Sequence, residues 1–405
     1  MEHDFTTHVD RRGQGSSKWE SMLRECPTAG VDVVPLSVAD MEFENPPEVK
    51  RALHALVDSA VLGYTEPTSR FFDACVGWQE RRHAWSPRKE WIVTSSGVVP
   101  AFFNAVRSLT REGGGVIIQP PVYYPFKMAV EASGRTLVEN PLILEGGRYE
   151  MDFDDLANKA ADPANTMLIL CSPHNPVGRV WSAEELRRLV DICVANDVMI
   201  VSDEIHDDLI MPGNEHTTIM RVMRPEEYRH VIVCTAPSKT FNLAGCQASV
   251  IYVPDEDVRT RFSDGFRRLA QFSLNIFGYT STIAAYEECA DWLDELIGVV
   301  WGNYEHLRDW AKRRHPELVV YPLEGTYLAW VDFRAWGLGS KELESFMKED
   351  ARLWLDEGYV FGESGAGFER INLACPADVL VTSLDRLDAA ASRRGLGSTA
   401  GRGRA

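Results

Sequence analysis

The stretch MLILCSPHNPVGRVWSAEELRRLVDICVANDVMIVSDEIH, residues 167–206, contains one complete strand–helix–strand unit. Met167–Cys171 and Val198–Ser202 are short apolar runs of strand length. Between them, Ser182–Asn196 has the periodicity of a helix and opens with a capping box formed by Ser182 and Glu185. Two strands joined through a helix predict parallel neighbours in a sheet that helices cover.

The same alternation continues on both sides of this unit. Further strands are expected at Trp91–Thr94, Val116–Gln119, Val231–Thr235 and Ala248–Val253, and helices at Val98–Leu109 and Phe126–Ser133. We therefore expect an α/β fold, with a large domain built on a mostly parallel sheet covered by helices on both faces.

The pattern changes near residue 290. A long helix is expected over Asp291–Arg314, a shorter one over Lys341–Asp350, and strands at Val319–Tyr321, Tyr327–Asp332 and Arg370–Leu373. These elements predict a smaller α+β domain built from the C-terminal part and the N-terminal segment. The predicted boundaries are 1–45 for an N-terminal arm that joins the small domain, 46–290 for the large domain, 291–392 for the small domain and 393–405 for a disordered tail rich in Gly, Arg and Ser.

Composition argues against two classes of partner. The 405 residues include 42 basic and 60 acidic side chains, a formal net charge of −18, whereas a nucleic-acid partner requires a basic face. No apolar run approaches the roughly 20 residues that span a bilayer, so no membrane partner is expected. The first residues lack a signal-peptide pattern, and the eight cysteines include no C-x-x-C pair. We expect reduced, buried thiols in a cytoplasmic protein.

In open α/β sheets, ligands bind beyond the carboxyl ends of the strands. The segments that follow the expected strands are Ser95–Gly97, Pro120–Tyr124, Ser172–Pro176, Asp203–His206 and Pro237–Thr240. Together they supply one lysine, a carboxylate pair, aromatic rings, an asparagine and small hydroxyl or glycine residues. The chain has neither G-x-G-x-x-G nor G-x-x-x-x-G-K-[ST], so dinucleotide and P-loop sites lack their motifs.

This collection of residue types suits one cofactor. A buried lysine can act as an amine nucleophile and form a Schiff base, and a neighbouring carboxylate can keep a pyridine nitrogen protonated. An aromatic ring can stack on a cofactor ring, and the start of a helix can bind a phosphate through backbone N–H groups. These are the parts needed to hold pyridoxal phosphate, whose protonated ring is an electron sink.

Three motifs then resemble fold-type I pyridoxal-phosphate enzymes of the aspartate aminotransferase superfamily: SPHNPVG at 172–178, SDEIH at 202–206 and SKTFN at 238–242. Within that superfamily the chain resembles the cystathionine β-lyase/cysteine-S-conjugate β-lyase branch. Supporting stretches are VADMEF at 38–43, LGY at 62–64, GTYLAW at 325–330 and FERINLACP at 368–376. The resemblance runs from about residue 5 to about residue 390, nearly the whole chain.

The resemblance implies a role for each matching residue around the cofactor ring. Lys239 would be the catalytic residue, as the Schiff-base lysine and the acid/base at the substrate Cα. Asp203 would pair with the pyridinium nitrogen and Asn175 with the ring hydroxyl. Tyr123 would stack on the ring, and His206 would belong to the same cofactor site.

It also implies how the charged ends of cofactor and substrate would be held. Ser96, Gly97 and Val98, at a helix N-terminus, would bind the phosphate together with Ser238. Tyr64 would reach the phosphate of the neighbouring subunit, which implies a homodimer with shared active sites. Arg370 would clamp the substrate α-carboxylate with its planar fork.

Three positions depart from the transaminase pattern. Gln247 stands where transaminase relatives usually place an arginine on the phosphate, and His206 stands where they usually have a tyrosine. Ala236 replaces a serine found in many relatives. The first two changes resemble the lyase branch, which implies α,β-elimination of L-cysteine thioethers (cystathionine or cysteine S-conjugates) to a thiol, pyruvate and ammonia.

Alternatives remain open at this point. The same residues could serve an aminotransferase, or an enzyme that cleaves a carbon–sulfur bond or deaminates oxidatively in secondary metabolism. A non-catalytic binding protein on this fold is disfavoured, because Lys239, Asp203, Asn175 and Arg370 are all retained. His174, Asp203 and His206 could suggest a metal site, but no helix-spaced histidine pair accompanies them, so no metal is expected.

Overall fold

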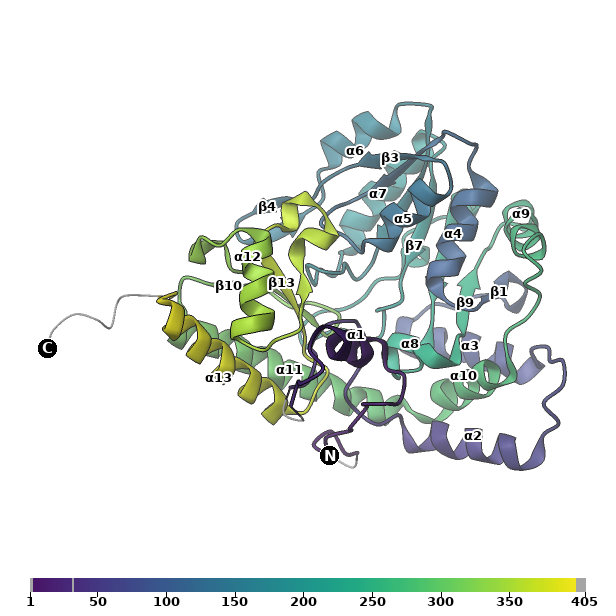
Figure 1. Cartoon of the computed structure of the whole chain (residues 1–405). Coiled ribbons are helices and arrows are strands. Elements are labelled where there is room, and N and C mark those ends of the chain that lie inside the picture. The colour runs from purple at the N-terminus through teal and green to yellow at the C-terminus, as the bar shows by residue number, and fades with distance from the viewer. Residues whose placement is uncertain (1–2, 31–32, 398–405) are drawn as a thin grey trace, which may run out of the picture.

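A computed structural model describes residues 3–30 and 33–397 (Figure 1). Its largest element is a seven-stranded sheet with the order β1-β9-β8-β7-β6-β2-β3. The strands are β1 (Ile92–Ser95), β2 (Gly115–Ile118), β3 (Thr136–Glu139), β6 (Asn165–Cys171), β7 (Met199–Asp203), β8 (Val231–Thr235) and β9 (Ser249–Tyr252). Strands β3, β2, β6, β7 and β8 run parallel, whereas β9 is antiparallel to both of its neighbours. The mostly parallel sheet is confirmed.

The strand–helix–strand unit at the centre of the sheet forms as predicted. Helix α7 (Ala183–Ala195) lies between β6 and β7, which pair in parallel with Cys171 opposite Asp203. Both hydrogen bonds of the capping box are present: Glu185 N donates to Ser182 Oγ, and Ser182 N donates to Glu185 Oε2. The carboxyl ends of these two strands therefore lie side by side.

Helices cover both faces of this sheet, as Figure 1 shows. Successive side chains of β6 enter different cores: Met167 and Ile169 pack in one, Leu168 and Leu170 in the other. The first core is closed by α4 (Val98–Leu109), α5 (Pro125–Ala132) and α9 (Glu256–Arg267). The second is closed by α7 with α3 (Ser69–His83), α6 (Phe153–Ala160) and α10 (Ile276–Glu288). Burial on both faces explains why these strands read as continuous apolar runs.

A second sheet forms the smaller unit. It is antiparallel, with the order β10-β11-β13-β12, and its strands are β10 (Val319–Val320), β11 (Leu328–Asp332), β12 (Asp356–Glu357) and β13 (Phe368–Asn372). The long helix α11 (Ala290–Arg314) runs beneath this unit in Figure 1, and α13 (Ala377–Arg394) packs beside it. The helix expected over Lys341–Asp350 is α-helical only as α12 (Ser340–Ser345), and Phe346–Asp350 continues as a wider π turn.

The N-terminal segment lies against the small unit, as expected. Leu36 N donates to Trp354 O, and Leu36 O accepts from Asn372 N, each at 2.9 Å. The predicted tail begins too early, because α13 extends to Arg394, so residues 393 and 394 are helical. Residues 398–405 of that tail lie outside the described residues.

Three further α-helices and one hairpin complete the α-helices and strands of the described residues. They are α1 (Ser17–Glu25), α2 (Pro47–Ser59), the single turn α8 (Pro237–Thr240), which directly follows β8 at the carboxyl edge of the large sheet, and a hairpin of β4 (Ile143–Glu145) and β5 (Arg148–Glu150). Among the described residues, no helix has both the length and the apolar character needed to cross a membrane.

Candidate active site

A cavity of about 160 Å³ opens beyond the carboxyl ends of the central strands. The predicted cofactor-binding residues line it, with the exception of Tyr64: Ser96, Gly97, Val98, Tyr123, Asn175, Asp203, His206, Ser238 and Lys239. These residues come from segments up to about 140 positions apart, and the sheet brings their strand ends to one edge.

Lys239 lies on the turn α8, directly after the buried strand β8. Its Nζ donates to the backbone oxygen of Ala39 at 2.5 Å. Desolvation lowers the pKa of Lys239 to about 8, with Arg370 acting in the same direction, although Asp40 and Asp203 oppose the shift. A larger fraction of this amine is therefore neutral near pH 7 than of an exposed lysine, which favours nucleophilic and base chemistry.

Asp203 ends β7 on the floor of the cavity and is buried. Burial raises the pKa of Asp203 to about 7, although a hydrogen bond from Ile205 N (3.2 Å) and the charge of Lys239 act against the shift. A buried carboxyl group that makes no ion pair of its own is suited to a cationic ligand group, such as a protonated ring nitrogen.

His206, three residues after the last residue of β7, is also buried and lines the cavity. Burial lowers the pKa of His206 well below its usual value, and the nearby Lys239 and Arg370 act in the same direction, which favours the neutral ring. Its Nδ1 has no hydrogen-bond partner in the structure. A buried polar atom without a partner costs free energy, which a ligand group in the cavity could recover.

One end of the cavity is suited to an anion. Ser96 and Gly97 precede α4, a helix of 12 residues whose N-terminus has no side-chain cap. The first N–H groups of such a helix have no partner within the helix. Ser238 and Gln247 line the same cavity, and Gln247 has a left-handed backbone (φ 49°). This corner offers backbone and hydroxyl donors to a phosphate.

Arg370 lies on β13 of the small sheet and does not itself line the cavity, but it contacts Asn175, which does. Its Nη1 donates to Asn175 Oδ1 at 2.8 Å, and its guanidinium lies 4.8 Å from the ring centre of Phe361. The side chain is buried, and its Nε has no partner. The small sheet thus contacts the loop after β6 through this pair of side chains, which places beside the cavity a guanidinium, the group that can bind a carboxylate through two parallel hydrogen bonds.

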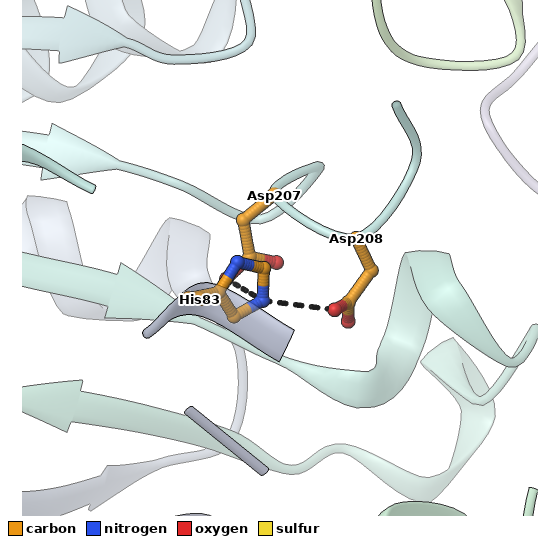
Figure 2. A group of neighbouring side chains, drawn as sticks. All are labelled: His83, Asp207 and Asp208. Atoms are coloured by element: carbon orange, nitrogen blue, oxygen red, sulfur yellow. Dashed lines mark hydrogen bonds and ion pairs between the residues drawn. The ribbon is translucent and has the colours of Figure 1, made fainter. Parts of the chain in front are cut away.

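Behind the cavity lies a buried charge cluster of His83, Asp207 and Asp208 (Figure 2). His83 Nε2 lies 2.9 Å from Asp208 Oδ1 and 3.4 Å from Asp207 Oδ2. Burial alone would lower the pKa of His83, but the two carboxyl groups outweigh it and raise the pKa to about 9. Asp208 Oδ2 also accepts from Thr240 Oγ1 at 2.8 Å, so the cluster anchors the residue that follows Lys239.

Among the residues that the structure describes, one group of histidine and carboxylate side chains lies close enough together to hold a metal ion, and it is this cluster. The three residues considered from the sequence, His174, Asp203 and His206, do not form such a group. His174 uses its Nε2 for a hydrogen bond with Pro121 O at 2.9 Å. Tyr64 is fully exposed and does not line the cavity of its own chain.

Residues 31–387 match the family described as aminotransferase class I and II. The chain belongs to this family. A curated relative, cystathionine beta-lyase PatB of Bacillus subtilis (strain 168), is 39% identical over 391 residues, which cover 96% of this chain and 100% of the relative. Two solved structures of the same fold extend the comparison.

Cystalysin from Treponema denticola, whose crystal structure contains pyridoxal 5′-phosphate, shares 45% identity at a TM-score of 0.95, over 97% of this chain and 100% of its own. The pyridoxal-phosphate-bound C-S lyase from Staphylococcus hominis shares 30% identity at a TM-score of 0.88, over 96% and 98%. The predicted fold and the predicted superfamily are therefore both confirmed.

Three features of this family member's site were not predicted from its sequence. Ala39 contacts Lys239 through a backbone oxygen, which carries no sequence signal. Asp356 forms an ion pair with Arg370 from the neighbouring strand β12. Asp208 holds Thr240 from the loop after β7. The VADMEF stretch at 38–43 matches the family although it lies outside every predicted element, but it does not indicate which of its atoms contacts Lys239.

Proposed function

We propose that the chain is a pyridoxal-phosphate-dependent carbon–sulfur β-lyase that acts on L-cysteine thioethers. The observation that carries this proposal is the single cavity that combines a lysine of lowered pKa, a buried unpaired carboxyl group and an adjacent arginine. The names of the 39% identical cystathionine beta-lyase and the pyridoxal-phosphate-bound C-S lyase support the same activity.

The residues of the cavity fit the cofactor. The carboxylate of Asp203 would keep the ring nitrogen protonated. The positive charge of that nitrogen would in turn compensate the buried negative charge of Asp203. Asn175 uses its Oδ1 to accept from Arg370, so its amide nitrogen remains available to the ring hydroxyl. Tyr123 lies beside the cavity to stack on the ring, and Lys239 would hold the cofactor covalently.

The phosphate would bind at the N-terminus of α4. Ser96, Gly97 and Val98 offer backbone N–H groups there, and Ser238 offers a hydroxyl. Gln247 can donate a neutral amide hydrogen bond where transaminase relatives usually place an arginine. His206 would stand near the ring as a neutral group.

Bound pyridoxal phosphate supplies an electron sink that stabilises negative charge at the Cα of an attached amino acid. Arg370 would bind and orient the α-carboxylate of that amino acid. Lys239, once displaced, would remove the Cα proton with an amine whose pKa is about 8. The net reaction consumes one thioether and one water and yields a thiol, pyruvate and ammonia.

We further propose a homodimer with shared sites and a cytoplasmic location. Tyr64 is fully exposed, and the apolar residues Val61 and Leu62 beside it are 91% and 58% exposed. A second copy that covers this segment would bury these side chains and bring Tyr64 to the partner's phosphate corner. The eight free cysteines fit a reducing compartment.

Product analysis tests the reaction. Purified protein is incubated with L-cystathionine or an S-alkyl-L-cysteine in the absence of any keto acid, and both thiol and pyruvate are measured, with Lys239→Ala as the matched control. We expect the two products in equal amounts from the wild type and neither from the variant. An aminotransferase would instead form product only with an added keto acid and would release no thiol.

A further inference from the structure

The guanidinium of Arg370 is held by two partners from different parts of the fold. Nη1 donates to Asn175 on the large unit, and Nη2 donates to Asp356 Oδ2 on β12, directly opposite Arg370 in the small sheet. A guanidinium has five N–H donors, so these two bonds leave three, including the buried Nε that has no partner. We expect the second N–H groups of Nη1 and Nη2 to bind a carboxylate that lies next to Asn175 in the adjacent cavity.

Asp356 makes a second contact that leads to Lys239. The same Oδ2 accepts from the backbone N–H of Val38 at 2.8 Å. Val38 has a left-handed backbone (φ 51°), which is strained for a β-branched residue and needs support from its surroundings. The next residue, Ala39, accepts through its backbone oxygen from Lys239 Nζ at 2.5 Å and from Tyr327 Oη at 2.9 Å.

One carboxylate therefore connects the two groups that the reaction needs at fixed positions. We propose that Asp356 is a positioning residue that orients Arg370 toward the α-carboxylate of the substrate and, through Val38, fixes the backbone that contacts Lys239. This inference rests on the proposed function, because it takes the ligand to be an α-amino acid.

Asp356 would act by preorganising Arg370, that is, by holding its side chain in the binding orientation before the substrate arrives. A free arginine side chain has many rotamers, and binding a carboxylate would have to immobilise it. The ion pair with Asp356, the bond to Asn175 and the ring of Phe361 below the guanidinium already restrict Arg370 to one orientation. Since Asp356 is itself an anion, it also competes with the substrate for the same cation. Positioning and competition predict opposite effects of removing its charge.

The test uses Asp356→Asn, which removes the charge but keeps an oxygen for Val38, and Asp356→Ala, which removes both. Glu357→Gln is the matched control, because Glu357 is the next residue of β12 and pairs with Lys348 at 2.8 Å rather than with Arg370. The probe for the carboxylate site is 3-(methylthio)propanoate, a thioether acid without an amine, and the corresponding amide is its uncharged counterpart. Binding to the holoenzyme is measured by calorimetry and by competitive inhibition.

We expect Asp356→Asn to weaken binding of the acid by roughly ten- to a hundredfold, the range for a lost charge-assisted bond, and to leave amide binding and the Glu357→Gln control unchanged. The variant should raise KM more than it lowers kcat. Asp356→Ala should lower kcat further and alter the pH dependence of the cofactor's visible absorption band, because the support for Val38 and Ala39 is lost as well.

Equal binding of the acid by Asp356→Asn would overturn the inference, and tighter binding would overturn it and identify Asp356 as a competitor. Equal weakening of the acid and the amide would also overturn it, because the effect would then be a general loss of structure. Arg370→Lys tests the carboxylate-binding role of Arg370 separately from the positioning role of Asp356. If that variant binds the acid as well as the wild type does, the carboxylate role within the proposed function fails, whatever Asp356 does.

Discussion

Asp203→Asn should stabilise the cofactor-free protein at neutral and alkaline pH while it abolishes lyase activity. The asparagine keeps the shape of the side chain and an oxygen for Ile205 N, but it removes a charge that the fold buries without an ion pair. In the structure, burial raises the pKa of Asp203 from 3.8 to about 7. Ionising this group in the folded protein is therefore unfavourable.

The size and the pH window follow from that shift. A rise of about three pKa units corresponds to roughly 4 kcal/mol at most, at about 1.4 kcal/mol per unit. Because the folded pKa lies above the unfolded one, the wild type loses stability relative to the variant as the pH rises from about 4 to about 7. The gain of Asp203→Asn should be near zero at the acidic end of this window and largest at pH 8.

Denaturation by guanidinium chloride at pH 5 and pH 8 measures the difference, with both proteins freed of cofactor and compared at one protein concentration. Adding pyridoxal phosphate should then stabilise the wild type more than the variant, because a protonated ring nitrogen compensates the charge of Asp203. If Asp203→Asn were no more stable than the wild type at pH 8, or if its gain were the same at both pH values, the assignment of Asp203 as an unpaired buried carboxyl group would be refuted.

Three further predictions use the same structure. Mixing Tyr64→Ala and Lys239→Ala subunits, each inactive alone, should restore activity at about one site in four if sites are shared between two subunits, and an inactive mixture would contradict shared sites. His83→Asn should destabilise the protein most below pH 6.5, because the pKa of His83 is raised to about 9 and its contribution to stability is lost as the pH rises through that value. Thermal unfolding of both proteins from pH 6 to pH 10 checks this. A difference in stability between them that does not change with pH would argue against it. Thr240→Val should lower the free energy of unfolding by roughly 1–3 kcal/mol, because it removes one hydrogen-bond donor from the buried Asp208. Denaturation by guanidinium chloride measures this change. An unchanged stability would show that the bond is dispensable.

The parts of the fold that the sequence predicted well are those with a local physical cause. Ser182 and Glu185 form the capping box that begins α7, and the apolar run ending at Cys171 is buried on both faces as β6. Because parallel strands of one sheet bring their carboxyl ends to the same edge, the sequence alone assigns the residues that follow these strands to one cavity.

The parts that the sequence did not predict depend on tertiary contacts. The antiparallel direction of β9 is set by its neighbours β1 and β8 rather than by the apolar run itself. The π turn at Phe346–Asp350 ends a segment that the sequence pattern predicts as α-helix throughout. The contact of Lys239 with a backbone oxygen of Ala39 joins positions 200 residues apart, and a backbone acceptor leaves no mark on residue type.

The claim at the centre of this account is that Lys239 holds pyridoxal phosphate in the cavity and serves as its base. Borohydride reduction of the purified holoenzyme fixes the cofactor to the amine that carries it, and mass spectrometry of the digested protein locates the modified residue. We expect the added mass of the phosphopyridoxyl group on the peptide that contains Lys239, together with loss of thiol and pyruvate formation. The same mass on another lysine, or unmodified Lys239 in a fully active cofactor-bound enzyme, would contradict it.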